Sequence, residues 1–270
     1  EYNHFVATYP SSPYLHQAEN EIYNLSTAKG TIKEFHNFIK TYPRNPNVEN
    51  AWRNIYRIYT ADSKTNSFVQ FKKDFPDYPF LADVKEDIEL SQKELLPAVN
   101  KGKWGFIDTA GNVVVPFLYD WAQPFSEGLA ECGVAGKSGF VNKAGRVVIP
   151  FEYEEANAFK GGYAVIAKNK KYGILNKSGK LAVPCEYDEI ADFSEGMAVV
   201  AKGNKYGYFD QSALLVVPIV YSKAGDYNEG MAAVELGGQT GFIDKAGKLV
   251  IGCKYDWAGN FMNGMARVKT

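Results

Sequence analysis

Apolar and polar residues follow two different patterns along the chain. In the first part, apolar residues recur at spacings of three and four, as at Val48, Ala51 and Ile55, which is the period of an amphipathic helix. In the second part, short apolar runs alternate with turns rich in Gly, Asn and Asp, which is typical of strands. The pattern therefore predicts a helical domain over residues 1–96 and an all-β domain over residues 97–270.

The helical region repeats with a period of 33 residues. A residue before Pro avoids the α conformation, so Tyr42 should end one helix. Asn45 and Pro46 have the form of an N-cap followed by Pro at the first helical position. Each unit is therefore expected to be a pair of helices. The positions that keep this step are Tyr9, Tyr42 and Phe75, then Pro13, Pro46 and Pro79, and then Ile22, Ile55 and Ile88.

These helical units resemble tetratricopeptide repeats, whose unit is a helix pair of 34 residues. The sequence "FHNFIKTYPRNPNVENAWRNIY" is most similar to the tetratricopeptide-like repeats found in bacterial envelope lipoproteins that help assemble the outer membrane. The family's internal Leu-Gly pair is missing, and each unit is one residue shorter. The resemblance implies an α-solenoid that binds a protein partner on its concave face.

The second region repeats with a period of 34 residues over five units without an insertion, which predicts tight stacking. In the first unit, Asp108 and Gly111 have the spacing of a short hairpin turn. Ala213 replaces this Gly in the fourth unit, so that turn should be strained or rebuilt. The positions that keep the step are Gly105, Gly139, Gly173, Gly207 and Gly241, and Tyr119, Tyr153, Tyr187, Tyr221 and Tyr255.

A third apolar run leads from each unit into the next, so the sheet unit should be a three-stranded meander that straddles the sequence repeat. The runs at 113–115 and 199–201 are continuously apolar, which predicts that both faces are covered. Third-strand sequences occur at both ends, at 95–100 and 265–270. This favours an open superhelical stack over a closed five-bladed ring, and an array that continues beyond Thr270.

The second region resembles the WG repeat family, also called KWG repeats after the tripeptide seen here as Lys103-Trp104-Gly105. Only the first unit keeps this Trp. The family resemblance implies a bacterial, often envelope-associated β-repeat without an established enzymatic activity. The whole chain is then an α+β repeat protein, with a tetratricopeptide-like α-solenoid followed by an antiparallel array of five WG repeats.

Charge and composition narrow the range of partners. Lys and Arg number 30 against 31 Asp and Glu, and no basic stripe stands out, so a nucleic-acid partner is not expected. No apolar run is long enough for a transmembrane segment. The chain opens with neither a Met nor a hydrophobic signal segment, which is typical of a processing boundary.

Neither the cysteines nor the acidic residues form a convincing catalytic or metal site. Cys132, Cys185 and Cys253 occupy slots that hold Ile, Val or Phe in other units, which indicates packing, and every His lies in the helical region. Acidic residues such as Asp120 and Glu127 recur from unit to unit, so they are expected to cap turns and loops. We therefore expect no catalytic residue, metal or cofactor.

Aromatic residues are the remaining candidates for ligand contact. Trp121 and Trp257 share a slot that elsewhere holds Glu or Lys, which indicates exposure, and Trp104 is unique in its own slot. These three Trp are the candidate ligand-binding residues. The Tyr119 series is instead expected to pack into the next unit, with each hydroxyl bonded to backbone.

Three functions follow from this pattern. We favour a non-enzymatic scaffold of the bacterial cell envelope, periplasmic, attached to the outer membrane or secreted, that binds a protein partner. The alternative is a module that binds glycan or cell-wall polymer through Trp121 and Trp257. A hydrolase would need a carboxylate pair in a cleft that only one unit contains.

Overall fold

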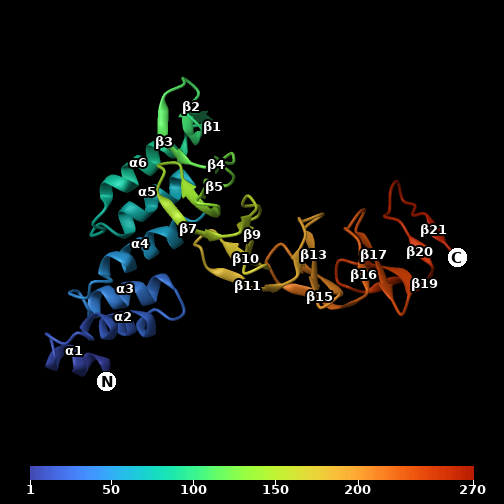
Figure 1. Cartoon of the computed structure of the whole chain (residues 1–270), viewed down its shortest axis with the longest axis horizontal. Helices are drawn as coiled ribbons and strands as arrows, with labels where there is room; N and C mark the ends of the chain where they lie inside the picture. Colours follow the sequence, from blue (N-terminus) through green and yellow to red (C-terminus); the bar gives the residue numbers. More distant parts are fainter.

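The structure, a computed structural model, describes all residues from 1 to 270 and places the helices before the strands (Figure 1). This confirms the predicted order of a helical part and a β part. None of the helices is long and apolar enough to cross a membrane. The helices are α1 (Tyr2–Thr8), α2 (Leu15–Ser26), α3 (Ile32–Thr41), α4 (Val48–Tyr59), α5 (Thr65–Asp74) and α6 (Leu81–Ser91).

Local chemistry sets the ends of the helices. Thr31 and Glu34 form a capping box at the start of α3, and α3 stops at Thr41, just before the Tyr-Pro pair. The predicted start of α4 at Pro46 is wrong by two residues. Pro46 lies in a separate turn, closed by a hydrogen bond from the Val48 amide to the Asn45 carbonyl, and α4 begins only after it.

The helical core is rich in aromatic side chains. Phe38, Ile55, Phe71 and Val84 are fully buried where successive helices meet. Tyr56 packs edge-on against Phe71, with ring centroids 4.8 Å apart. This core joins α2 to α6, so the helices form one continuous arm.

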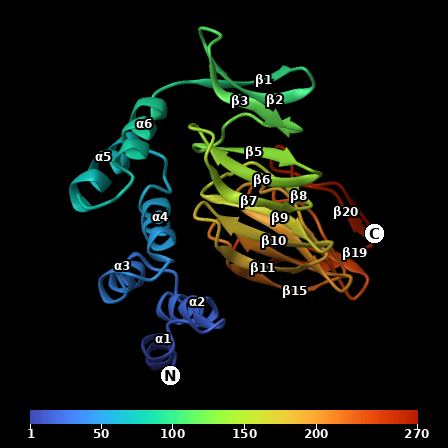
Figure 2. The same cartoon turned by 60° about the vertical axis from the view of Figure 1, so that its left-hand side comes forward.

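The β part is a row of separate antiparallel sheets (Figures 1 and 2). A full sheet has the predicted three-stranded meander and, in addition, a two-residue strand from the preceding unit. The first sheet is β1 (Leu95–Asn100), β2 (Lys103–Asp108) and β3 (Val113–Tyr119), and the second is β4 (Trp121–Ala122), β5 (Leu129–Val134), β6 (Lys137–Asn142) and β7 (Val147–Tyr153).

The later sheets repeat the second one. The third is β8 (Glu155–Ala156), β9 (Tyr163–Lys168), β10 (Lys171–Asn176) and β11 (Leu181–Tyr187), and the fourth is β12 (Glu189–Ile190), β13 (Met197–Lys202), β14 (Lys205–Asp210) and β15 (Leu215–Tyr221). The fifth is β16 (Lys223–Ala224), β17 (Met231–Leu236), β18 (Gln239–Asp244) and β19 (Leu249–Tyr255), and β20 (Trp257–Ala258) pairs with β21 (Val268–Lys269). The last sheet lies far from the first, as expected for an open stack (Figure 1).

The hairpin turn has the predicted chemistry. Asp108 accepts hydrogen bonds from the amides of Ala110 and Asn112 at 3.0 and 2.9 Å, and Gly111 takes a φ of +85°. Ala213 adopts the same left-handed conformation, with a φ of +58°. Of the two expected outcomes, strain and rebuilding, the structure therefore shows strain.

A close backbone approach explains the glycine at the Gly105 position. A Cβ on Gly241, its equivalent in the fifth unit, would lie 2.5 Å from the carbonyl oxygen of Ile251. The register of β18 against β19 shifts at this point. Only a residue without a side chain lets the two strands come together here.

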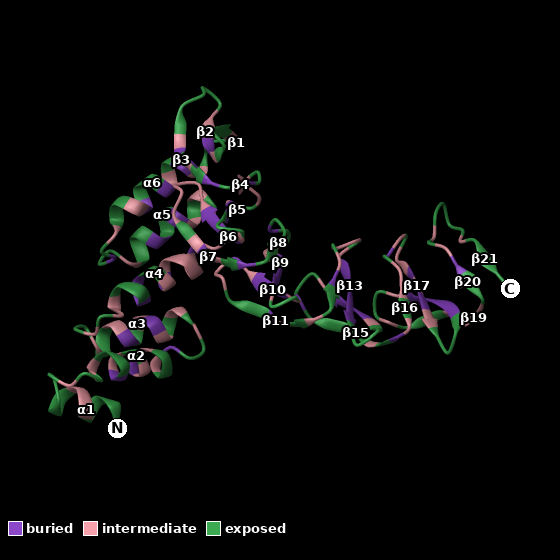
Figure 3. Cartoon of the chain, viewed as in Figure 1, coloured by how far each residue is buried: buried purple, intermediate pink, exposed green.

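Burial differs between the strands of a sheet (Figure 3). The middle strands, such as β5, are buried on both faces. The outer strand β3 alternates, because Val113 is 55% exposed while Val115 is buried. The prediction of two covered faces is therefore right for residues 199–201 in β13, which are buried like β5, and wrong for β3, because the next sheet packs only against the inner face of β3.

Glutamates connect one unit to the next. Both carboxylate oxygens of Glu127 accept hydrogen bonds from the amides of Gly161 and Gly162, at 2.7 and 2.9 Å. Glu195 and Glu229 each make the same pair of bonds to two consecutive amides of the next unit. Gly161 occupies the glutamate position of the second unit, so the contact between the second and third units lacks this link.

Candidate functional site

The candidate site is a cleft between the helical arm and the first sheets of the β array. It has a volume of about 390 Å³ and lies between α2, α4 and α6 on one side and the turns next to β7 and β10 on the other. Ligand pockets typically measure about 300 to 1,000 Å³. The cleft is therefore large enough for a small ligand or for a short segment of a partner.

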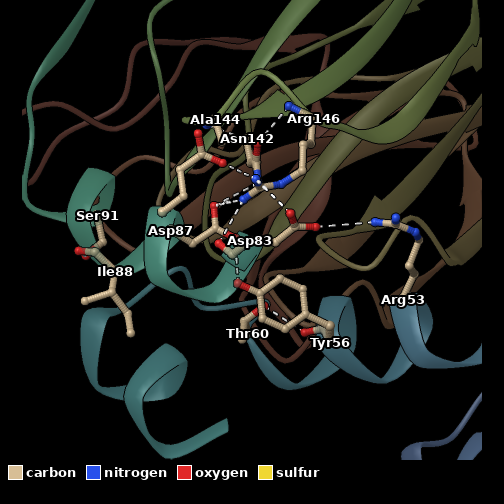
Figure 4. Close-up of polar contacts among 11 residues, drawn as sticks. Arg53, Tyr56, Thr60, Asp83, Asp87, Ile88, Ser91, Asn142, Ala144 and Arg146 are labelled. Atoms are coloured by element: carbon tan, nitrogen blue, oxygen red, sulfur yellow. Dashed lines mark hydrogen bonds and ion pairs between the residues drawn. The ribbon is translucent and has the colours of Figure 1, made fainter. Parts of the chain in front are cut away.

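Arg146 closes one wall of the cleft. Its guanidinium, just before β7, lies beside the carboxylates of Asp83 and Asp87 on α6 (Figure 4). It also pairs with Glu86 on the same helix. Asp87 is only 5% exposed, and it also accepts hydrogen bonds from the Tyr56 hydroxyl at 2.5 Å and from the side-chain amide of Asn142, at the end of β6, at 3.2 Å. A buried carboxylate is tolerated only when it is paired and hydrogen-bonded in this way.

The protonation equilibria in this wall reflect burial and charge. Burial raises the pKa of Asp87, and the hydrogen bond from Tyr56 and the charge of Arg146 act in the opposite direction without cancelling it. Burial alone would lower the pKa of Arg146, but the carboxylates of Asp87 and Asp83 raise it. Arg146 is therefore a fixed cation that joins the two parts of the chain.

A second contact holds the end of α6. The ammonium of Lys143, in the turn after β6, donates hydrogen bonds to the carbonyl oxygens of Ser91 and Lys93. These carbonyls lie at the C-terminal end of α6, where a cation is favoured by the helix dipole. Ser63 also lies against Gly128 with no room for a side chain on the glycine. The cleft is thus held open between two fixed walls.

Two further cations line the cleft without forming an ion pair. Arg57 on α4 donates one hydrogen bond to the carbonyl oxygen of Val148, at 3.2 Å, and another to the side chain of Asn54. Its Nε is buried and has no partner. Lys177, in the turn after β10, is only 8% exposed and makes neither a hydrogen bond nor an ion pair. Burial lowers the pKa of both side chains.

The three candidate Trp residues lie in three different sheets, and none of them lines the cleft. Trp104 is half-buried on β2 against the first sheet's core. Trp121 is also half-buried rather than exposed, because its indole N–H donates to the carboxylate of Glu131 at 2.7 Å. Trp257 on β20 is 52% exposed, as expected for this slot.

The repeated tyrosines pack as expected but bond differently. Tyr119 is buried in the core between the first two sheets, and burial raises its pKa to about 12. The expectation that these hydroxyls bond to backbone is wrong: the Tyr119 hydroxyl makes no hydrogen bond to backbone, and it is not a fully buried atom, so it reaches solvent. Two tyrosines at other repeat positions do bond to backbone: the hydroxyls of Tyr208 and Tyr227 donate to the carbonyl oxygens of Gly225 and Asp244.

The cysteines of the β array pack against other side chains, and its carboxylates accept hydrogen bonds from turns. Cys132 is buried, and burial raises the pKa of its thiol to about 12. Cys185 and Cys253 are only partly buried, which corrects the expectation for these two. Asp120 accepts a hydrogen bond from the Ala135 amide and pairs with Lys103 at 2.6 Å.

Sequence reasoning missed Arg57, Arg146 and Lys177, although two of them break the repeats. Arg146 stands where the other units have Asn112, Lys180, Leu214 and Lys248, and Arg57 stands where the 33-residue step gives Asn24 and Leu90. A residue that differs from its equivalents in the other repeats could therefore have pointed to Arg57 and Arg146. Lys177 gave no such signal, because Lys also occurs at this position in two other units.

Solved structures share parts of this architecture at low similarity. They include a eukaryotic initiation factor (13% identity, 66% of this chain, 58% of that chain, TM-score 0.40) and PorZ, a surface component of the type-IX secretion system of Porphyromonas gingivalis (12%, 65%, 34%, 0.31). BamB from Moraxella catarrhalis is similar at 9% identity, with 65% of this chain and 63% of that chain covered and a TM-score of 0.32. With TM-scores this low, none of them carries a functional argument.

Family membership rests on the β array. No curated protein matches the chain significantly in sequence. The chain also spans less than two thirds of each of the three solved structures. The family model described as "WG containing repeat" matches residues 104–131, 139–172, 172–206, 206–239 and 241–270, which together make up more than half of the chain. Only the six helices support the resemblance to tetratricopeptide repeats. By its β array, the chain belongs to the WG-containing repeat family.

Proposed function

We propose that this protein is a non-enzymatic scaffold that holds a protein partner in the cleft between its helical arm and its β array. The observation that carries the proposal is the pair of fixed walls around the cleft. Arg146 and Lys143 attach the β array to α6, and Arg57 reaches from α4 to the backbone of β7. Binding costs less free energy when the site is already in place.

The chemistry of the β array supports a binding role over catalysis. Asp108 caps its own turn, and Glu127 links its unit to the next. Because these carboxylates serve the repeat itself, they are poor candidates for the acid and base of a hydrolase. The side chains that depart from the repeat pattern, Arg57 and Arg146, gather at the cleft instead.

We place the protein in the bacterial cell envelope. This part of the proposal rests on the resemblance of "FHNFIKTYPRNP" to helical repeats of envelope lipoproteins. Fractionation of cells that produce the protein from its own gene tests it directly. Recovery in the cytosolic fraction alone would contradict this location.

Site-specific photo-crosslinking tests the scaffold itself. A photoreactive residue at Asn50, which lines the cleft, should trap one discrete partner in intact cells, identified by mass spectrometry. The matched control carries the same residue at Leu215, on the exposed edge of β15. If both positions give the same adducts, or neither gives any, the cleft does not hold a partner.

A glycan-binding role remains the second candidate because Trp257 is exposed. An exposed indole can stack on a sugar ring, whereas Trp121 is held by Glu131. On a glycan array, Trp257→Ala should then lose binding and Trp121→Ala should keep most of it. The absence of any glycan signal with the unaltered chain would dismiss this candidate.

A further inference from the structure

The cleft carries more positive charge than its own carboxylates can neutralise. Four cationic side chains line it, namely Arg53, Arg57, Arg146 and Lys177, against two carboxylates, Asp83 and Asp87. The chain as a whole has a net charge of −1, so this excess is local. These two carboxylates pair with Arg146 and Arg53, which also pair with Glu86 and Glu49, whereas neither Arg57 nor Lys177 forms an ion pair.

The environment of Lys177 is unusual among the lysines at its repeat position. Lys143, one unit earlier, donates to two carbonyl oxygens at the end of α6. Lys245, two units later, donates to the Glu195 carbonyl at 2.7 Å and pairs with the Glu195 carboxylate at 3.2 Å. Lys177 makes no such contact: the negative charges of Glu127 and Asp62 lie near enough to act against the lowering of its pKa by burial, but neither carboxylate forms an ion pair or a hydrogen bond with it.

Arg57 and Lys177 belong to the same corner of the cleft. The turn that carries Lys177 also contains Gly179, and a Cβ there would lie 3.5 Å from Nη1 of Arg57. A guanidinium has five N–H groups, of which Arg57 uses one for Val148 and one for Asn54. Because Arg57 has no carboxylate partner and its buried Nε has no acceptor, an anion that enters this corner would compensate a desolvated charge.

We propose that this corner binds a carboxylate of an acidic peptide segment, with Arg57 and Lys177 as its two cationic contacts. A carboxylate matches the planar fork of a guanidinium and can also accept from an ammonium. Tyr23 and Phe68 line the same cleft and give the rest of the segment an apolar surface. The inference rests on the proposed function, because it places the carboxylate on the bound partner.

The first test is calorimetric titration of the full chain with a short blocked peptide of Asp and Glu, compared with the same peptide in which every acid is an amide. The acidic peptide should bind at least about tenfold more tightly, since a hydrogen bond to a charged group contributes roughly 1.5 to 3 kcal/mol. Arg57→Gln and Lys177→Gln should each remove most of this preference. Lys245→Gln is the matched control and should keep it, because that lysine already has a partner.

Thermal unfolding of the free variants gives a second, independent readout. Lys177→Met removes a largely buried side chain whose charged form is disfavoured by burial, so it should unfold at a higher temperature than the unaltered chain. Lys245→Met breaks an existing ion pair and should not. Equal effects of the two substitutions would overturn the claim that Lys177 lacks an ion pair.

The arms of the experiment separate the possible failures. If phosphate binds with the same dependence on Arg57 and Lys177 while the acidic peptide does not, the carboxylate assignment is wrong. If crosslinking traps a partner but the acidic and amide peptides bind alike, the inference fails and the scaffold stands. If the acidic peptide binds and no partner is trapped, the carboxylate site stands and the scaffold role fails.

Discussion

The guanidinium of Arg146 in the β array pairs with the buried carboxylate of Asp87 on α6. This ion pair, together with the contacts of the same guanidinium to Asp83 and Glu86, joins two repeat arrays of different period. Their relative position, and with it the shape of the cleft, depends on this contact and on the hydrogen bonds that Lys143 makes nearby. The contact is therefore the first place to perturb.

Arg146→Ala should loosen the helical arm. The substitution leaves Asp87 buried without its cation, which typically costs about 3 to 5 kcal/mol. Chemical denaturation should show that loss of unfolding free energy, and small-angle X-ray scattering should show a larger maximum dimension. Arg53→Ala is the control, because Arg53 is exposed and its ion pairs should contribute less than about 1 kcal/mol. Equal losses in both variants would argue against a special role for Arg146.

Gly161→Glu should strengthen the contact between the second and third units. The new carboxylate would reach the amides of Glu195 and Gly196, as Glu127 reaches those of Gly161 and Gly162. Gly161 already has the positive φ that Glu127 adopts, at 62° against 51°, and has open space around it. We expect the midpoint of thermal unfolding to rise by roughly 2 to 4 °C.

The matched control for this substitution is Gly161→Ala. Alanine takes the same backbone conformation without a carboxylate, so it carries the strain of a positive φ and gains no hydrogen bond. Calorimetry should rank the glutamate variant above the alanine variant. The reverse order would show that the link adds no stability at this contact.

Gly241→Ala should destabilise the last full sheet. Its Cβ would meet the Ile251 carbonyl oxygen at 2.5 Å, so β18 and β19 would have to separate. Overpacking of this kind typically costs about 1 to 3 kcal/mol. Gly252→Ala in the same sheet is the control, since its Cβ would meet nothing within 4 Å and its φ is not positive. Hydrogen exchange of the β18 amides should rise only in the first variant.

Alkaline pH should destabilise the β array through its buried tyrosines. Burial raises the pKa of Tyr119 and of Tyr153 from 10.0 to about 12. The folded state therefore holds these phenolic protons more tightly than the unfolded chain does, so the associated stability is complete below pH 10 and is lost as the pH rises toward 12.

Two titrations check the alkaline prediction. Circular dichroism should show unfolding within that pH window, and ultraviolet absorbance should show that the buried phenols ionise together with it. Tyr119→Phe removes one of these groups and should shift the transition to higher pH. A smooth ionisation at pH 10 in the folded protein would contradict the prediction.

The local structure was largely predictable because local chemistry determines it. The 33- and 34-residue periods gave the helix pairs, the meanders and the change between them. Asp108 and Gly111 form the expected turn because an Asp side chain and a left-handed glycine act on neighbours within a few residues. The exposure of Val113 was not predicted, because apolar composition alone does not tell how much of a strand the next sheet covers.

The sequence by itself determined the kinds of element, the repeat boundaries and membership of a family of β-repeats. Only the tertiary structure decided where the cleft lies and which side chains line it. Arg57 bonds to a carbonyl 91 positions away in the chain, and Lys177 is buried because the helical arm lies over its turn. Such contacts depend on the angle at which the two arrays join, and no periodic pattern within either array specifies that angle.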